Sequence, residues 1–452
     1  MRLVKSTTAL LRSSVPVFSA LFITSVAFSQ ENSPYSRYGV GDVVPNQNVV
    51  NRGMGGIAAG YSDLQSINFV NPASLGGMQN TIFDLGAEID IRNLKSNTTP
   101  AKFQSVNTLI SYLQIGFPIG SEKMRKKQTS WGVSFGLRPV TRINYKIRTD
   151  ERTAIDSLST LFEGSGGISQ ANISTGIKFK NLSFGVSTGY SFGSKDYSTQ
   201  REIVNDSVFH YPSNTAATTR FGGLFVNTGM QYDFFIKDKE TKKIKSLFRL
   251  GAYANLQQNL SAKRSEIQQT ISYDGNGGFL NVDTVSFTKD VAGTVKIPAT
   301  YGIGFTYVNN NLIFGADLEM SNWSDYRYYD QPESLQNNYT IRVGGQYYPA
   351  KDNTPATKYW SFVKYRAGLY YGNDYVKVNN QSKPNYGLTL GAGLPLTSLA
   401  RTAYNREVVV LNTGIEMGAR GNKQSQSLRE NILRFSIGVS MNARWFFKPK
   451  YD

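Results

Sequence analysis

Hydrophobic and polar residues alternate along most of the chain after residue 80. The first alternating segment places five apolar side chains on one face: Phe83, Leu85, Ala87, Ile89 and Ile91. Its other face carries polar or small residues: Asp84, Gly86, Glu88 and Asp90. Strict alternation over this length predicts a β-strand with one apolar and one polar face. Because the pattern recurs as far as residues 433–445, the sequence predicts an all-β chain.

About fourteen such segments follow one another, an even number as expected for a barrel made of one chain. They lie at 81–93, 107–120, 129–148, 170–180, 181–200, 220–236, 245–265, 293–308, 312–328, 338–349, 360–375, 385–397, 407–419 and 429–446. Tight turns such as Lys180-Asn181 and 309–311 alternate with longer connections, which we expect to be loops: 149–169, 194–219, 266–292 and 373–384. Short turns at one end and long loops at the other are typical of outer membrane barrels.

A soluble β-sandwich also alternates, but three features favour a membrane barrel. The polar faces are rich in Gly and Ser, aromatic residues gather near the strand ends, and the segments are long. A tilted strand needs about 9 to 11 residues to cross a bilayer. Only helices and closed barrels satisfy their backbone hydrogen bonds in lipid. We therefore predict a transmembrane antiparallel β-barrel over residues 81–452.

Residues 30–80 break the alternation. The stretch Asn51–Gly60 is rich in Gly and small residues, and Asn68–Leu75 follows it shortly before the first strand. Glycine permits close approach of one backbone to another, so such a segment can fold compactly inside a barrel. We predict that residues 30–80 form a plug in the lumen. The alternatives are an ordinary periplasmic extension or a frayed first strand.

The pattern of residues 1–29 predicts a secretory signal peptide. A basic start precedes the apolar run Val15–Phe28, and Ala27-Phe28-Ser29 predicts cleavage between Ser29 and Gln30. The run is too short to anchor a membrane protein as a helix. The chain has no Cys, which excludes lipidation, disulfides and thiol metal sites. An export signal before a barrel predicts the outer membrane of a Gram-negative bacterium.

The chain is strongly basic, with a formal net charge of +17. Removing the three basic residues of the signal peptide leaves about +14, a balance that often indicates nucleic acid. An exported chain, however, meets the phosphate groups of lipids rather than nucleic acid. We therefore expect membrane lipid and lipopolysaccharide as partners, and no nucleic acid.

Several segments resemble the FadL-type outer membrane transporters: Ser66–Leu75 with its Asn71-Pro72-Ala73, Ile297–Phe305, Phe314–Leu318, Tyr365–Tyr371 and Leu390–Pro395. The resemblance implies a fourteen-stranded barrel, an N-terminal hatch and passage of hydrophobic molecules. On that basis we assign the hatch turn to Asn68, Asn71, Pro72 and Ala73; a plain turn into the first strand is the alternative. The segment Tyr35–Asp42 does not map onto a ligand-contacting hatch.

Pro139 follows the alternating part of the third predicted strand. Proline cannot donate to a β-ladder, so its position predicts a bulge or a gap in pairing. FadL-type transporters release substrate sideways at a kink in this strand. By resemblance, Gly136 and Pro139 would mark a lateral gate, whereas a bulge at the barrel rim is the other interpretation.

Charged residues occupy the polar strand faces, among them Asp84, Glu88, Asp317, Glu319, Arg342 and Arg366. Buried charges are costly unless they are paired. We predict that these lumen charges pair with one another and hold the plug. Binding of a carboxylate headgroup is the alternative.

The sequence offers little chemistry for catalysis. The one histidine, His210, lies in a predicted outer loop, and no Gly-x-Ser-x-Gly motif accompanies it. A cluster of metal ligands and a phosphate-binding glycine loop are also absent from the sequence. We expect no enzyme activity, no cofactor and no metal site.

Two functions remain open. One is a FadL-like channel for passive uptake of hydrophobic, fatty-acid-like molecules, with lateral exit near the third strand. The other is a non-transporting barrel that serves as a subunit or docking scaffold of an envelope protein complex, as secretion-system accessories of this family do. An apolar pocket between the plug and the loops would favour the channel. A lumen filled with paired charges would favour the scaffold.

Overall fold

The computed structural model describes residues 33–95, 102–120, 124, 127–152, 156–204, 208–241, 243–275, 278–350, 358–377, 382–397, 408–421 and 428–443. The predicted signal peptide and the C-terminal residues 444–452 lie outside this set. Among the described residues, no helix has the length and apolar character needed to cross a membrane.

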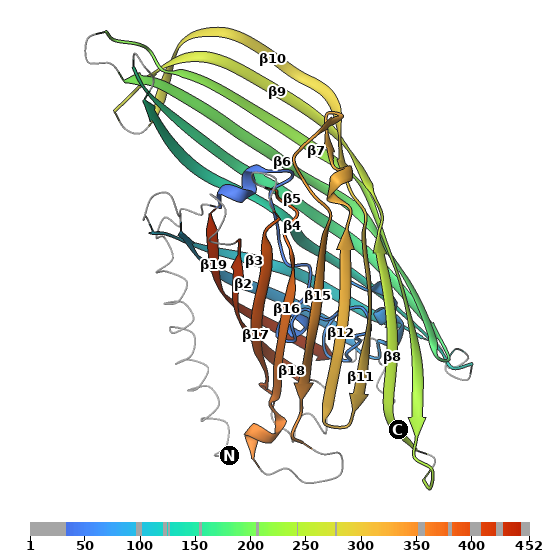
Figure 1. Cartoon of the computed structure of the whole chain (residues 1–452). Helices are drawn as coiled ribbons and strands as arrows, with labels where there is room; N and C mark the ends of the chain where they lie inside the picture. The colour runs from blue at the N-terminus through green and yellow to red at the C-terminus, as the bar shows by residue number, and fades with distance from the viewer. Residues whose placement is uncertain are drawn as a thin grey trace, which may run out of the picture.

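Fourteen antiparallel strands form a closed barrel, which confirms the predicted fold (Figure 1). The wall strands are β2 (Thr81–Lys95), β3 (Lys102–Ile119), β4 (Thr129–Arg152), β5 (Ser157–Phe179), β6 (Leu182–Val204), β7 (Ser213–Lys237), β8 (Ile244–Asn255), β11 (Thr300–Asn309), β12 (Leu312–Ser321), β15 (Asn338–Tyr347), β16 (Lys364–Asn373), β17 (Pro384–Pro395), β18 (Val408–Arg420) and β19 (Arg429–Ala443). The last strand pairs with the first, from Arg429 opposite Lys95 to Ala443 opposite Thr81, and this pairing closes the wall.

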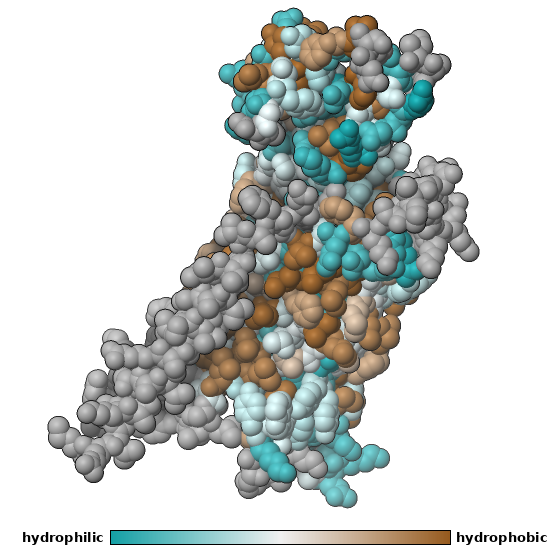
Figure 2. Space-filling model, turned by 90° about the vertical axis from the view of Figure 1, so that its left-hand side faces the viewer, coloured by the Kyte–Doolittle hydropathy of each residue, from teal (hydrophilic) through white to brown (hydrophobic). Residues whose placement is uncertain are grey.

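Alternation along each wall strand sorts side chains between the outside and the lumen, as predicted. In β2, Leu85 and Ile89 are exposed on the outer face, whereas Asp84 and Glu88 are buried inside. Figure 2 shows hydrophobic side chains gathered at mid-height on the visible face of the barrel wall. We call the end with the tight turn Lys180-Asn181 the lower end, and the opposite end the upper end.

Four wall strands, β4 to β7, continue far above the barrel and are joined there by β9 (Gln258–Tyr273) and β10 (Phe279–Ile297) (Figure 1). We call this extension the upper sheet. Strand β7 pairs with β8 in the barrel and with β9 above it. A small hairpin of β13 (Arg327–Tyr328) and β14 (Gln331–Pro332) pairs with the lower end of β10.

The predicted loops 149–169, 194–219 and 266–292 are therefore wrong, because most of their residues are strands of the upper sheet. Every residue from Phe279 to Ala292 in β10 is exposed. A strand with solvent on both faces needs no apolar face, so the sequence of β10 loses the alternation that identifies a strand. The predicted segment 312–328 also ends early, since β12 stops at Ser321 before the 3-10 turn η3 (Trp323–Asp325).

The N-terminal segment fills the lumen, so the predicted plug is confirmed as part of the fold. It contains η1 (Pro34–Arg37), β1 (Asp42–Val43), the short helix α2 (Val49–Arg52) and η2 (Pro72–Gly77). It begins at the upper end, where the Ser33 amide donates to the Asn144 carbonyl at 3.1 Å. It ends at the lower end, where η2 lies against β5 and β6 before β2 begins. A further 3-10 turn, η4 (Tyr359–Phe362), precedes β16.

Glycines let the plug backbone rest directly on the wall. A Cβ on Gly251 of β8 would lie 1.9 Å from the Ala59 carbonyl oxygen, and one on Gly368 of β16 would lie 2.2 Å from the Gly55 amide nitrogen. Gly55 itself has a φ of +70°, in the left-handed region that favours glycine. The plug and the wall are therefore fitted to each other at the backbone level.

Candidate functional site: the plugged lumen

Asn68 stabilises a bend of the plug through hydrogen bonds to its backbone. Its Nδ2 donates to the carbonyls of Ala58 at 2.7 Å and Tyr61 at 2.8 Å, and its Oδ1 accepts from the Val70 amide at 3.2 Å. All of these groups are buried. Because buried backbone groups need partners, one asparagine satisfies three of them at a bend without regular structure.

Asn71 joins the plug to the wall. Its Oδ1 accepts from the Ala73 amide at 3.1 Å and caps η2, while Nδ2 donates to the carbonyls of Ala59 at 2.7 Å and Ala252 at 3.2 Å. Pro72 occupies the first position of η2, where its missing N–H costs nothing. The four residues assigned to the hatch thus lie together in the lower lumen.

Three of the predicted lumen carboxylates contact the plug. Asp317 accepts from the amides of Ala58 at 2.5 Å and Ala59 at 2.8 Å. Asp84 accepts from the Ile67 amide at 3.2 Å. Glu88 forms an ion pair with Arg52 of α2. These wall acids bind the plug through its own donors.

The other predicted charges bond to the wall. Glu319 pairs with Arg342 at 2.9 Å and also accepts from the Tyr253 hydroxyl. Arg366 donates to the side-chain oxygens of Gln346 at 2.8 Å and Asn412 at 2.9 Å. The structure thus brings Glu319 and Arg342 together but does not pair Arg366 with a carboxylate among the described residues.

The sequence did not reveal a second ionic cluster at the upper end of the plug. Asp42 accepts from Arg92 at 2.6 Å and from Arg420 at 2.7 Å, and Arg420 also pairs with Asp374. Burial alone would raise the pKa of the Asp42 carboxyl, but these two guanidinium groups hold it well below its usual range. Asp42 and Arg420 are too far apart in sequence for any local pattern to link them.

Lys383 is buried beside this cluster, in the connection between β16 and β17. Its Nζ lies 3.1 Å from the ring centroid of Tyr35 in η1. Burial, together with the nearby Arg420, lowers the pKa of Lys383 to about 7. The N-terminal turn of the plug therefore packs against a lysine that titrates near neutral pH.

A cavity of about 270 Å³ lies between the plug and the upper wall. Six arginines line it: Arg52, Arg92, Arg138, Arg342, Arg420 and Arg434. Four carboxylates line it as well: Asp42, Glu319, Asp374 and Glu416. The cavity is small, and its lining carries many charges.

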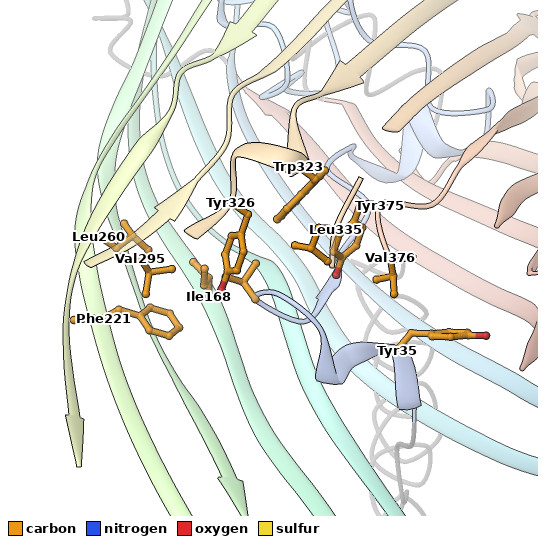
Figure 3. Packing of buried hydrophobic residues seen from close by; sticks show 12 residues of the cluster. Tyr35, Ile168, Phe221, Leu260, Val295, Trp323, Tyr326, Leu335, Tyr375 and Val376 are labelled. Carbon is orange, nitrogen blue, oxygen red and sulfur yellow. The ribbon is translucent and has the colours of Figure 1, made fainter. Parts of the chain in front are cut away.

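The large apolar side chains at the upper end are packed against one another. Trp323 stacks on Tyr375 with ring centroids 4.5 Å apart, and the Tyr326 ring lies next to Ile168 in the same cluster (Figure 3). All members of this cluster are buried. They form a packed layer contributed by the plug, the upper sheet and the upper connections.

Gly136 and Pro139, the predicted gate residues, lie where β3 and β4 separate. Pairing between these strands stops at Leu113 opposite Leu137, and β4 shows a bulge between Pro139 and Thr141 in its pairing with β5. We call this gap the seam. The plug covers the β4 edge there, since β1 pairs with Thr141 and the Val44 amide donates to the Val140 carbonyl. The Gln114 side chain fills the space beside Gly136.

His210 is exposed in the connection between β6 and β7. Among the described residues, no group of three or more His, Cys, Asp or Glu side chains is arranged to hold a metal ion.

Comparison with known proteins gives one family and one fold. The model of a protein family described as BamG matches residues 12–452. The structure is similar to a FadL homologue of Pseudomonas aeruginosa, at 14% identity and a TM-score of 0.54, over 89% of this chain and 99% of that one. It is also similar to the toluene transporter TodX of Pseudomonas putida, at 14% identity and a TM-score of 0.54, over 89% of this chain and 100% of that one. The toluene transporter TbuX of Ralstonia pickettii is similar at 13% identity and a TM-score of 0.51, over 88% of this chain and 98% of that one. At such identities the likeness concerns the fold. No curated protein matches the sequence.

Proposed function

Since this chain belongs to the BamG family, we propose that it is an outer membrane barrel that serves as a non-transporting subunit or docking scaffold of the BAM complex. The family name supports the choice of partner. The apolar side chains on the outer face of the wall and the likeness to outer membrane channels support the location. The strands of a closed barrel pair their backbone groups with one another, as lipid requires, and here they do so except where β3 and β4 separate at the seam.

The filled lumen is the observation that carries the proposal. A channel for hydrophobic molecules needs an apolar pocket that takes up most of the ligand surface. Here the plug is bonded to the wall through Asn71 and Asp317, and six arginines and four carboxylates stand among the polar and apolar residues that line the remaining cavity. Transferring an apolar molecule into such a space gains little and leaves charged groups less well solvated.

The upper sheet supplies a surface for partners. At its far end Phe209 is 76% exposed, and Leu280 of β10 is 64% exposed, with Val208, Tyr211 and Val285 also exposed. Figure 2 shows hydrophobic and hydrophilic residues mixed over this region, beyond the hydrophobic side chains at mid-height on the wall. Exposed apolar side chains away from lipid are typical of protein interaction sites.

The test is purification of the tagged chain from membranes in mild detergent, with quantification of the proteins that accompany it. We expect a constant set of envelope proteins that includes BAM components. The double variant Phe209→Asp with Leu280→Asp should reduce that set about tenfold or more, because a buried charge weakens an apolar contact strongly. Ser286→Asp, which adds a charge at an exposed polar position of β10, is the control and should leave the set unchanged.

Passive passage of hydrophobic, fatty-acid-like molecules is the second candidate. The seam beside Pro139 favours it, since unpaired wall strands could let a ligand leave sideways into the bilayer. Extraction and mass spectrometry of the purified barrel would then yield a stoichiometric apolar molecule, lost on substitution of Pro139 or Asn71. A barrel without such a molecule would contradict this second candidate.

We also propose that the chain has no enzymatic activity and needs no cofactor. Its one histidine, His210, is exposed in the connection between β6 and β7. Hydrolysis of a chromogenic ester by the purified barrel, abolished by His210→Ala, would contradict this proposal.

A further inference from the structure

Arg138 differs from the other arginines of the cavity. Arg52, Arg92, Arg342, Arg420 and Arg434 each have a carboxylate within 4.0 Å. Arg138 forms no ion pair with any residue that the structure describes, although it is only 7% exposed. Its Nη2 donates to Gln170 Oε1 at 3.0 Å, its Cζ lies 5.1 Å from the Phe69 ring centroid, and its Nη1 has no hydrogen-bond partner in the described chain.

The groups around Arg138 orient it without neutralising it. Gln170 donates to the Ser191 hydroxyl at 3.1 Å, and Ser191 donates to Gln258 at 2.9 Å. This chain of neutral groups fixes the amide oxygen that accepts from Arg138. A buried guanidinium is costly when no negative charge offsets it, and Arg is suited to binding phosphate through two parallel N–H bonds.

Arg138 also lies beside the seam. It directly follows Leu137, the last residue of β4 that pairs with β3. The pair Val43 and Thr141, which covers the β4 edge above it, lines the same cavity. Outside, exposed apolar residues such as Ile110 follow β3 along the seam. A headgroup at Arg138 could therefore belong to a lipid whose chains stay on the outer face of the wall.

We propose that the lumen cavity binds a phosphate group at Arg138, as the headgroup of a lipid at the seam or as free phosphate. Asn255 lines the same cavity, and its Oδ1 has no hydrogen-bond partner in the described chain. Because the two ends of an amide are interchangeable in orientation, Asn255 can turn its NH₂ group to the phosphate oxygens. The site takes the phosphate group itself, which is the part of the ligand that Arg138 and Asn255 can recognise.

The first arm of the test uses inorganic phosphate on the intact barrel in detergent. If the site binds free phosphate, the melting temperature of the wild-type barrel rises with the logarithm of the phosphate concentration, by about 2–5 °C at a hundredfold excess over the Kd. Arg138→Gln should abolish the rise. Arg148→Gln, on the same strand but exposed in the upper sheet, is the control and should keep it. Chloride at equal ionic strength corrects for general salt effects.

The second arm adds phosphatidylglycerol in mixed micelles and detects bound lipid by native mass spectrometry. A lipid that binds the wild type and the Arg148→Gln control, but not Arg138→Gln, identifies the headgroup as the ligand even where free phosphate has no effect. Arg138→Met guards against a folding defect, because it removes the charge and keeps an apolar stem. If neither probe acts through Arg138, or if Arg138→Met responds to them as the wild type does, the proposal is overturned. Neither arm depends on whether BAM components accompany the barrel.

Discussion

At the scale of single residues, the plug depends on polar side chains that replace regular secondary structure. Between α2 and η2 its backbone groups find partners on Asn68, Asn71 and Asp317. The Asn71-Pro72-Ala73 turn could be predicted from the sequence because a cap acts within three residues. The partners of Asp42 and Arg52 could not, since each lies on a distant strand that only the closed barrel brings near.

Substitution of Asp317 should loosen the plug. In Asp317→Ala the amides of Ala58 and Ala59 lose their acceptor while they stay buried, which costs roughly 2–4 kcal/mol. We expect faster hydrogen exchange in residues 54–61, measured by mass spectrometry. Asp317→Asn keeps an oxygen acceptor and should show a smaller effect. Unchanged exchange in Asp317→Ala would contradict the role assigned to this carboxylate.

The buried Lys383 predicts that the stability of the folded chain depends on pH. Its pKa is about 7 in the folded chain, whereas an unperturbed lysine has a pKa of 10.5, so the unfolded chain binds more protons between these limits. The free energy of unfolding therefore rises as the pH increases from about 7 to 10. Below pH 7 the buried lysine is protonated, and its full destabilising effect is present. Arg420, Asp374, Glu430 and Asp42 face the same site.

The measurement is the melting temperature of the wild type and of Lys383→Met between pH 6 and 10. Lys383→Met should melt several degrees higher at pH 6, and the difference should shrink as the pH rises. Lys263→Met, at an exposed position of β9, is the control for loss of a lysine. A difference that is constant with pH would contradict the assignment.

At the scale of elements, the structure separates two kinds of strand. Wall strands such as β2 alternate because one face is apolar and the other meets the plug, and the sequence identifies them. β10 is exposed on both faces, so its side chains carry no period. Three register shifts in its pairing with β9 bend this edge strand, and bulges of that kind discourage pairing with other strands. The upper sheet is therefore identified from the backbone pairing in the structure and not from the sequence pattern.

The contact between plug and wall predicts a graded effect of glycine substitutions. Gly251→Ala should destabilise the barrel by roughly 1–3 kcal/mol, because the new methyl group would overlap the Ala59 carbonyl. Gly414→Ala, on β18, is the matched control, since its Cβ would meet nothing closer than 3.7 Å. The urea midpoint of the gel-mobility shift between folded and unfolded barrel measures both. Equal midpoints would argue against a plug that rests on β8.

At the scale of the whole molecule, a closed lumen occurs together with a sheet that extends above the barrel on one side. The lumen is closed by a plug bonded to the wall, by an ionic cluster around Asp42 and by the apolar cluster at the upper end. The upper sheet rises on one side of the barrel only (Figure 1) and exposes apolar side chains at its tip. The molecule thus combines a plugged interior with exposed apolar side chains on the outside of the wall and at the tip of the upper sheet.

The most direct measurement is native mass spectrometry of the particle extracted from membranes in mild detergent. It weighs the accompanying proteins and any small apolar ligand in the same sample. The proposed function predicts this barrel in a particle of fixed composition with BAM components, and no stoichiometric hydrocarbon in its lumen. A lone barrel that carries a stoichiometric hydrocarbon, released when Asn71 or Pro139 is substituted, would contradict the scaffold and favour the channel.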